Sequence, residues 1–284
     1  MSEPTPKSTR ALLRELDLRP RKGLGQNFLI DESVPPKILA AAQLTTSDRV
    51  LEIGPGVGVL TLRLAPIVRE LITIELDARL YPYLYQQLAI YPSARLIEGD
   101  ALDFDPAQLA PAPYKLVANI PYYITSAILR HFLESSHRPT RLVLMVQKEV
   151  AQRIVAQPPE MSLLAVSVQF FGKPKIFASV PAGAFLPPPK VDSAILLIET
   201  FGSDERPCPA VAVGDEAQFF ELVRAGFGQK RKQLVNTLTR GLNLAKEQSR
   251  AILETAQVAP QNRAEQLTLA DWNRLYAAWR TALQ

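Results

Sequence analysis

Three closely spaced glycines form the sequence feature best suited to hold a ligand. Gly54, Gly56 and Gly58 directly follow an apolar run (residues 49–53) that predicts a buried strand. Glycine lets the backbone approach a ligand closely, and the helix expected after the turn would offer unpaired N–H groups at its start. A dinucleotide site would need the spacing G-x-G-x-x-G, with its last glycine where this chain has Val59, so the turn argues against NAD or FAD.

Two acidic residues follow the next two expected strands. Glu75 closes the run 70–75, and Asp100 comes just after the run 94–98. A carboxylate in the first position can accept from two ribose hydroxyls, and one in the second can accept from an adenine amino group. Either acid alone could instead cap a helix, as Asp77 beside Glu75 suggests. Together with the glycine turn, the two acids favour a nucleoside cofactor.

An Asn-Ile-Pro-Tyr sequence follows the fourth expected strand. The Asn119 side-chain oxygen and a nearby backbone carbonyl can accept both N–H protons of an adenine amine, which would orient its nitrogen lone pair. Pro121 restricts the backbone, and Tyr122 can stack on the base. The alternative is an ordinary proline turn with a core tyrosine. Because this sequence follows the glycine turn and the two acids that favour a nucleoside cofactor, we expect it to form a site for a planar amine.

The surrounding pattern predicts the elements that position these residues. β-Branched runs alternate with helical patterns, which is typical of an α/β domain with a mainly parallel sheet. We expect seven strands, at residues 49–53, 70–75, 94–98, 114–119, 141–147, 173–180 and 193–200, and helices at 57–64, 78–88, 126–133 and 148–156. The segment 163–171 is apolar almost throughout, so its periodicity does not separate helix from strand. Residues 202–209 are rich in turn formers and predict a linker, and the chain from Glu216 onward is expected to be helical.

The Asn-Ile-Pro-Tyr sequence is similar to the signature of methyltransferases that act on exocyclic amines with S-adenosylmethionine. More narrowly, the chain resembles the small-subunit ribosomal RNA adenine N6,N6-dimethyltransferases, the KsgA/RsmA family. Nine segments carry the resemblance in family order: residues 25–29, 52–58, 74–77, 99–101, 119–125, 147–150, 185–194, 227–232 and 263–265. The chain departs from the family at 161–165, where Tyr-Gly often precedes Leu-Ser.

The resemblance implies a Rossmann-like class I methyltransferase fold with a mostly parallel seven-stranded sheet and a small all-α C-terminal domain. By this resemblance, residues 1–31 would form a basic N-terminal arm or lid, 32–201 the S-adenosylmethionine-binding methyltransferase domain, and 202–284 a helical RNA-binding domain.

The family's site residues map onto matching positions of this sequence. The expected cofactor-binding residues are Asn27, Leu29, Gly54, Gly56, Glu75, Asp100, Ala101 and Asn119. The expected catalytic residues are Asn119, Pro121, Tyr122 and Phe185, with Tyr122 and Phe185 flanking the target adenine. Asn27 and Leu29 precede the first expected strand, and only the resemblance assigns them to the cofactor.

The implied activity is S-adenosylmethionine-dependent dimethylation of the N6 amines of two adjacent adenosines in the 3′-terminal hairpin loop of 16S (small-subunit) rRNA during ribosome biogenesis. One alternative is a large-subunit rRNA adenine N6-methyltransferase that confers antibiotic resistance. Another is a non-catalytic ribosome assembly factor. The segments 185–194 and 263–265 favour the first reading over the second. The third is disfavoured by four intact site residues: Gly54, Glu75, Asp100 and Asn119.

Charge distribution suggests where RNA would bind. The net charge of +4 is uneven: residues 1–31 carry +2, residues 32–220 carry −3, and residues 221–284 carry +5. Basic ends are typical of nucleic-acid-binding surfaces, although a solvated helical face would look the same. The expected RNA-binding residues are Arg21, Lys22, Lys230, Arg231 and Lys232.

Composition bounds the remaining possibilities. The chain has 284 residues with 47% hydrophobic and 21% charged, enough for two folded domains. A single cysteine, Cys208, and two histidines, His131 and His137, make a zinc site improbable. We find neither a run long enough to span a membrane nor an apolar signal core, and so expect a cytoplasmic protein. The family resemblance implies a small ribosomal subunit precursor as its partner, and we expect the protein to be a monomer.

Overall fold

The computed structural model describes residues 8–202, 208–212 and 215–283, and their contacts divide the chain into two compact units. The first unit runs to Ala151 and includes Pro174–Thr200, and the second combines Gln152–Lys173 with the residues from Phe201 onward. Residues 152–173 therefore lie outside the unit to which the predicted 32–201 domain assigned them. Packing explains the difference, because Phe170 stacks on Phe219 with ring centroids 4.8 Å apart.

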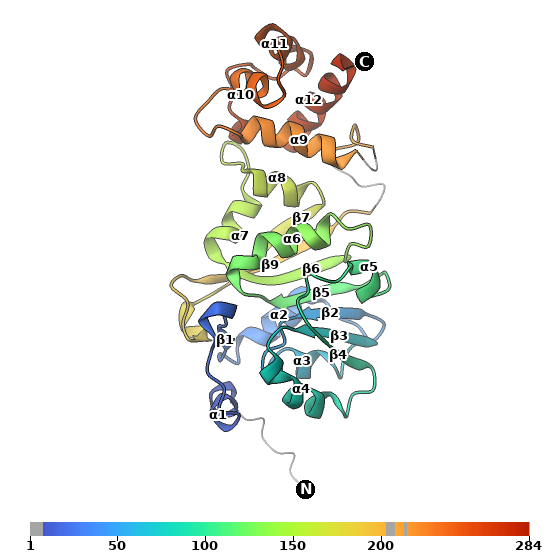
Figure 1. The fold of residues 1–284 in the computed structure, drawn as a ribbon, viewed down its shortest axis with the longest axis vertical. Coiled ribbons are helices and arrows are strands. Elements are labelled where there is room, and N and C mark those ends of the chain that lie inside the picture. Colours follow the sequence, from blue (N-terminus) through green and yellow to red (C-terminus); the bar gives the residue numbers. More distant parts are fainter. Residues whose placement is uncertain (1–7, 203–207, 213–214, 284) are drawn as a thin grey trace. The chain divides into compact units, whose positions relative to one another are not determined.

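The first unit is built on a seven-stranded sheet with strand order β4-β3-β2-β5-β6-β9-β7 (Figure 1). The strands are β2 (Arg49–Ile53), β3 (Glu70–Glu75), β4 (Ala94–Glu98), β5 (Lys115–Asn119), β6 (Arg141–Gln147), β7 (Gly172–Val180) and β9 (Ser193–Thr200). The pairs β4-β3, β3-β2, β2-β5 and β5-β6 are parallel, whereas β9 runs antiparallel to β6. The predicted mostly parallel seven-stranded sheet is confirmed, with strand ends within one residue of those expected.

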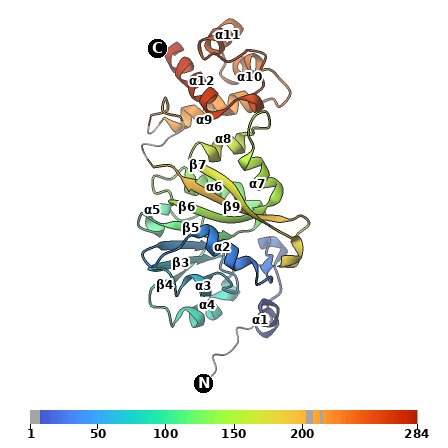
Figure 2. The same ribbon diagram turned by 180° about the vertical axis from the view of Figure 1, so that it is seen from behind.

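Helices cover the sheet because each of its faces carries apolar side chains. Helix α2 (Val34–Ala42) packs across β5, β6 and β9 and buries Ile38 and Ala41 in the core beneath it (Figure 2). Helix α6 (Thr125–Leu133) lies over the opposite face, where Ile128 and Phe132 are fully buried. The other helical segments of this unit are α1 (Thr9–Glu15), η1 (Lys22–Leu24), α3 (Thr61–Leu64), η2 (Ala78–Leu80), α4 (Tyr81–Leu88), α5 (Pro106–Leu109), η3 (Tyr122–Ile124) and η4 (Ala182–Ala184), and α7 (Lys148–Val155) runs from this unit into the second.

The glycine turn shortens the helix that follows it. The sequence predicted a helix over 57–64, but α3 begins only at Thr61. Gly54, Gly56 and Gly58 adopt positive φ angles of 69°, 57° and 80°, which no helical residue adopts. The turn therefore reaches further along the chain than the apolar periodicity suggested.

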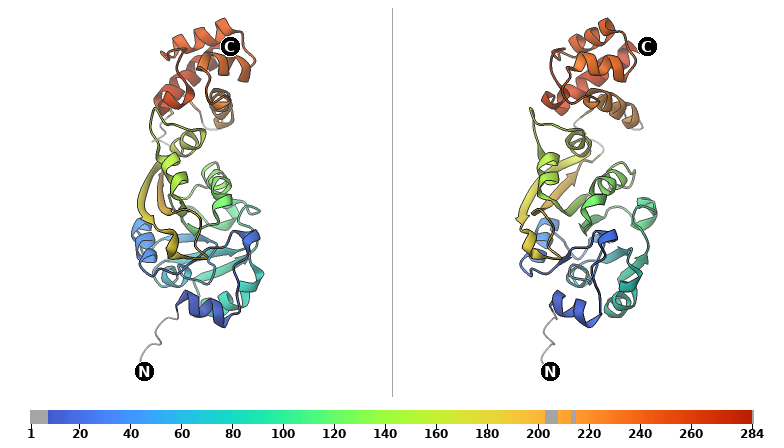
Figure 3. Two further views of the ribbon diagram at one scale, coloured as in Figure 1. Left: turned by 90° about the vertical axis from the view of Figure 1, so that its left-hand side faces the viewer. Right: turned by 60° about the vertical axis from the view of Figure 1, so that its left-hand side comes forward.

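The N-terminal segment is tied to the end of the sheet domain by a second, two-stranded sheet. β1 (Phe28–Leu29) pairs antiparallel with β8 (Phe185–Leu186), a segment more than 150 residues later. Upstream, α1 lies outside the large sheet (Figure 3) and packs through Leu13 into a cluster that contains Phe28 and Leu84. The segment between α1 and β1 is therefore anchored at both ends.

The second unit is helical, as the sequence predicted for residues from Glu216 onward. It comprises α8 (Leu163–Gln169), α9 (Glu216–Phe227), α10 (Leu234–Gly241), α11 (Lys246–Thr255), η5 (Ala264–Gln266) and α12 (Leu269–Ala282). Its core is apolar: Leu222, Leu238, Leu253, Trp272 and Leu275 are each at most 1% exposed. Most of the predicted 202–209 linker lies outside the described residues. Among the residues described in either unit, we find no helix with the length and apolar character needed to span a bilayer.

Candidate functional site

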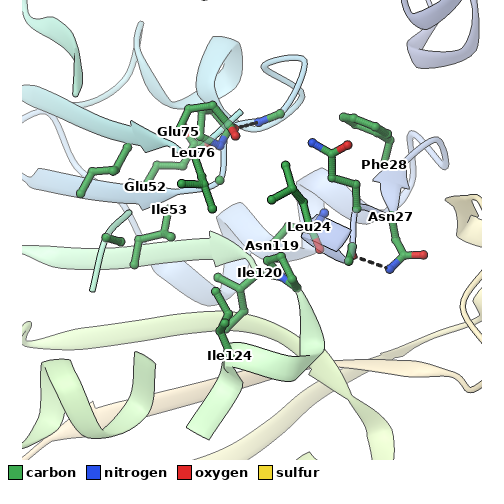
Figure 4. Close-up of a pocket in the computed structure, with 18 of the residues that line it drawn as sticks. Leu24, Asn27, Phe28, Glu52, Ile53, Glu75, Leu76, Asn119, Ile120 and Ile124 are labelled. Atoms are coloured by element: carbon green, nitrogen blue, oxygen red, sulfur yellow. Dashed lines mark hydrogen bonds between the residues drawn. The ribbon is translucent and has the colours of Figure 1, made fainter. Parts of the chain in front are cut away.

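A pocket opens where β2, β3 and β5 end, between the glycine turn and the N-terminal segment (Figure 4). The carboxyl ends of adjacent parallel strands meet at one edge of a sheet, which is where α/β proteins bind ligands. Its lining includes every residue predicted to hold the cofactor: Asn27, Leu29, Gly54, Gly56, Glu75, Asp100, Ala101 and Asn119. Pro121 and Tyr122 line it as well.

The glycine turn shapes the floor of the pocket through its backbone. Gly54 N–H donates to the Ile74 carbonyl at 2.9 Å, which ties the turn to β3. A β-carbon on Gly56 would lie 3.4 Å from Cε1 of Phe28, so the absence of a side chain lets the N-terminal segment approach the turn. The glycines of the turn thus bring backbone to the pocket, while Pro55 and Val57 of the same turn also line it.

Glu75 is fixed by two backbone donors. Its Oε2 accepts from Gly56 N–H at 3.0 Å and its Oε1 accepts from Asp77 N–H at 2.8 Å. The carboxylate is 6% exposed, and burial raises the pKa of Glu75 despite these bonds. Because each carboxylate oxygen has two lone pairs, Glu75 can accept two further hydrogen bonds from a ligand.

The helix-cap interpretation of the acids fits Asp77 and, in part, Asp100. Asp77 caps η2, where its Oδ1 accepts from Arg79 N–H at 3.3 Å. Asp100 Oδ1 accepts from Leu102 N–H at 3.0 Å, which closes a local turn. One Asp100 oxygen is therefore committed to the backbone, and the other makes no hydrogen bond to the described residues.

The Asn-Ile-Pro-Tyr segment brings to the pocket a carboxamide, that of Asn119, with no hydrogen-bond partner among the described residues. Asn119 ends β5 and is half-buried. Tyr122 begins η3, and its hydroxyl lies 2.6 Å from Oγ of the buried Ser193. This hydrogen bond holds the Tyr122 ring in place, and burial raises the pKa of its hydroxyl.

Phe185 is the one predicted catalytic residue that does not reach the pocket in this structure. Its backbone pairs with Leu29 in the small sheet, and its ring is 1% exposed in the core cluster that contains Ile38. The sequence interpretation had this ring flank a substrate base. Such stacking would require the ring to leave a well-packed core, so we assign it no contact with substrate.

Glu52 is a pocket residue that the site prediction missed. It is 1% exposed, and burial raises its pKa to about 8. Its Oε2 and the hydroxyls of the neighbouring Thr61 and Thr73 do not meet hydrogen-bond geometry with any described residue. The two threonine hydroxyls still lower the pKa of Glu52, but by less than burial raises it. A glutamate inside an otherwise apolar strand was the available signal, because a buried carboxylate needs a specific reason to be there.

Asp77 joins the N-terminal segment to the end of β3. Its Oδ2 accepts from Gln26 Nε2 at 2.8 Å, its Oδ1 accepts from Arg79 Nε at 2.9 Å, and Arg21 Nη1 lies 3.7 Å from Oδ1. Burial opposes ionisation, but the hydrogen bonds from Arg79 and Gln26 outweigh it and hold the pKa of Asp77 at about 2. Asp77 N–H also binds Glu75, so one residue links the segment to the predicted ribose acceptor.

The predicted RNA-binding residues lie in both units. Arg21 and Lys22 are exposed beside the pocket at the start of η1, although Arg21 is also paired with Asp77. Lys230, Arg231 and Lys232 are exposed on the turn between α9 and α10. Across the described ranges, no group of three or more histidine, cysteine, aspartate or glutamate side chains could hold a metal ion.

The strand order, the antiparallel β9 and the pocket at the glycine turn define a class I methyltransferase fold. A sequence model described as "Ribosomal RNA adenine dimethylase" matches residues 18–280, and the chain belongs to that family.

Relatives and solved structures agree with this assignment. A protein of Dehalococcoides mccartyi named ribosomal RNA small subunit methyltransferase A is 48% identical over 91% of this chain and 88% of its own length. A protein of the same name from Pelotomaculum thermopropionicum is 41% identical over 94% of both chains. The crystal structure of a dimethyladenosine transferase from Plasmodium falciparum superposes with a TM-score of 0.75 at 27% identity, covering 87% of this chain and 95% of that one. The 23S rRNA methyltransferase ErmE gives a TM-score of 0.70 at 29% identity, covering 89% and 99%.

Proposed function

We propose that this protein transfers methyl groups from S-adenosylmethionine to the N6 amines of two adjacent adenosines in the 3′-terminal hairpin loop of small-subunit rRNA. One observation carries the proposal: the carboxamide of Asn119, which no described residue hydrogen-bonds, lies in the same pocket as the glycine turn and the buried carboxylate of Glu75. A methyl acceptor and a nucleoside donor could therefore meet there. Family membership and the names of the relatives support rRNA as the substrate class.

The residues present fit S-adenosylmethionine. Glu75 retains lone pairs for two ribose hydroxyls, and the glycine turn leaves backbone open to a close ligand. The free oxygen of Asp100 suits an adenine amino group, while Asn27, Leu29 and Ala101 complete the lining. When bound, S-adenosylmethionine supplies a methyl group already activated by its positive sulfur.

The protein's own contribution is orientation of the acceptor amine. The Asn119 side-chain oxygen and the carbonyl of Ile120 or Pro121 would each accept one N–H of the adenine amine. These bonds favour a pyramidal nitrogen, which withdraws its lone pair from the ring and makes it a better nucleophile. The neutral amine needs no base before it attacks, and its proton can leave after the new C–N bond has formed. Most of the rate enhancement would therefore come from holding the amine in line with the methyl group. The adenosine must leave its stack to reach this pocket, and Tyr122 can flank the base there.

RNA contacts outside the pocket would come from the two basic surfaces. Lys22 and Arg21 would meet phosphates beside the pocket, and Lys230, Arg231 and Lys232 would make the helical unit an RNA-binding domain. In this proposal the segment up to residue 31 acts as a lid over the cofactor. The protein would act as a cytoplasmic monomer on a precursor of the small ribosomal subunit.

Methyl labelling of ribosomal subunits tests the proposal. Immature small and large subunits are incubated separately with labelled S-adenosylmethionine, and the labelled nucleotides are mapped. We expect dimethylated adenosines at two adjacent positions of small-subunit RNA alone. Label only in large subunits would favour the antibiotic-resistance alternative, and label in neither would favour a non-catalytic assembly factor.

The Asn119→Ala variant tests the role of the carboxamide in the same assay. It should lower the methylation rate by about a hundredfold, because general positioning effects of this kind reach that size. Its affinity for S-adenosylmethionine, measured by calorimetry, should change far less. An equal loss of rate and of donor affinity would restrict Asn119 to cofactor binding.

A further inference from the structure

Tyr123 presents an exposed aromatic ring among the residues that line the pocket. It is 64% exposed, the largest exposed fraction among the large aromatic side chains of the described residues, yet it belongs to the pocket lining. A residue that is both exposed and part of a pocket lies at its mouth. An aromatic ring at the mouth of a pocket can stack on a nucleic-acid base.

The N-terminal segment fixes the position of this ring. Gly25 has a positive φ of 59°, and a β-carbon there would lie 3.0 Å from Cε1 and 3.1 Å from Cδ1 of Tyr123. The ring is therefore packed along one edge against backbone, which leaves its remaining surface open to solvent. An aromatic ring held by its edge is preorganised to stack, because little conformational freedom is left to lose on binding.

The neighbouring residues indicate what would stack there. Asn119 and Tyr122, which would receive the target adenine, lie only a few residues before Tyr123, and the Tyr122 hydroxyl is already bound to Ser193. Lys22 and Arg21 precede Gly25 by three and four positions and are exposed. A planar ring beside basic side chains suits a nucleotide, whose base stacks and whose phosphate meets the cation.

We propose that Tyr123 is a second aromatic platform, at the mouth of the pocket, that stacks on the RNA base adjacent to the adenosine held by Asn119. This inference rests on the proposed function, since it takes RNA as the substrate. It assigns Tyr123 to substrate positioning: the stacked neighbour would hold the RNA strand open while the target base occupies the pocket.

Kinetics with immature small subunits test the platform. Tyr123→Ala should raise the KM for subunits about tenfold or more, the loss expected for one base–aromatic stack. The kcat, and the affinity for S-adenosylmethionine measured by calorimetry, should stay near the wild-type values. Tyr123→Phe should retain the wild-type KM because it keeps the ring. Tyr85→Ala is the matched control: Tyr85 is 50% exposed on α4 and does not line the pocket.

A fluorescence experiment gives a readout that does not require methylation. In Tyr123→Trp the new side chain should be exposed, whereas the native Trp272 and Trp279 are 0% and 5% exposed. A synthetic RNA with the 3′-terminal hairpin of the small subunit should quench this tryptophan and shield it from acrylamide, and S-adenosylmethionine alone should do neither.

The outcomes separate this inference from the proposed function. A Tyr123→Ala KM no higher than that of Tyr85→Ala, a primary loss of donor affinity, or an unshielded tryptophan would each overturn the platform. Failure of the wild-type protein to label small subunits would overturn the proposed function instead, whatever the fluorescence shows.

Discussion

Glu52 should make the stability of this protein fall as pH rises. The carboxyl group is 1% exposed in β2, and burial raises its pKa to about 8, from 4.5 in an open chain. Between those two values the native protein holds a proton that the unfolded chain releases. Each pH unit in that window therefore costs about 1.4 kcal/mol of the free energy of unfolding, and the loss is complete above the native pKa.

Replacement of Glu52 by glutamine isolates this effect. Glu52→Gln keeps the shape of the protonated acid and cannot ionise, so it should gain stability relative to wild type as pH rises. From about pH 4.5 to about pH 7 the gain amounts to about 3 kcal/mol. In a unit of this size, that is about 10 °C in the difference between the two melting temperatures.

Thermal unfolding followed by circular dichroism across this pH range is the assay. It should be run without ligand, because a bound donor would stabilise the native state separately. The other titrating groups are shared by the two proteins, so the difference reports Glu52 together with its coupling to Glu75, whose charge contributes to the raised pKa of Glu52. Parallel curves for Glu52→Gln and wild type would refute the reasoning, since they would mean that Glu52 ionises equally in both states.

Three further predictions concern the cofactor, the N-terminal segment and RNA. Glu75→Ala should weaken S-adenosylmethionine binding about tenfold or more in calorimetry, since a charged acceptor of ribose hydroxyls is lost; unchanged affinity would remove Glu75 from the site. Asp77→Asn should reduce the free energy that holds the N-terminal segment against the sheet domain by about 2 kcal/mol, because the native pKa of about 2 lies below the usual 3.8. Ionised Asp77 provides this stability above pH 3.8, and it is lost as pH falls from 3.8 to about 2. Trypsin should then cleave the N-terminal segment faster than in wild type, and equal rates would contradict the link. Reversal of Lys230, Arg231 and Lys232 to glutamate should weaken RNA binding. The negative slope of log affinity against log salt should become less steep by about two to three, whereas an unaltered slope would indicate a merely solvated surface.

The pattern of residues along the chain was sufficient to predict the strands of the sheet and the edge of the sheet at which the pocket lies. Seven strands were predicted because short runs rich in β-branched residues alternate with helical patterns and end at turn-forming residues. Gly54, Glu75, Asp100 and Asn119 could be predicted to meet because parallel strands bring their carboxyl ends to one edge. Their meeting in one pocket is observed, and their roles toward a ligand stay predictions.

Contacts between distant parts of the chain could not be predicted in this way. Gln26 meets Asp77 across 51 positions, and Phe185 enters the core by pairing with Leu29. The apolar segment 163–171 gave no periodicity to distinguish helix from strand, and it became a helix that packs with the second unit. Each of these outcomes depends on a surface that another part of the chain supplies.

The amino-acid sequence by itself determined the family, the order of strands along the chain and the residues at their ends, because these follow from periodicity and short motifs. Only the tertiary structure decided which side chains remain available. It buried Phe185, bound Tyr122 to Ser193, left the Asn119 carboxamide without a hydrogen bond to the described residues and set Tyr123 at the mouth of the pocket. The physical reason is that burial and hydrogen-bond satisfaction depend on every neighbour at once, and most of those neighbours are remote in the chain.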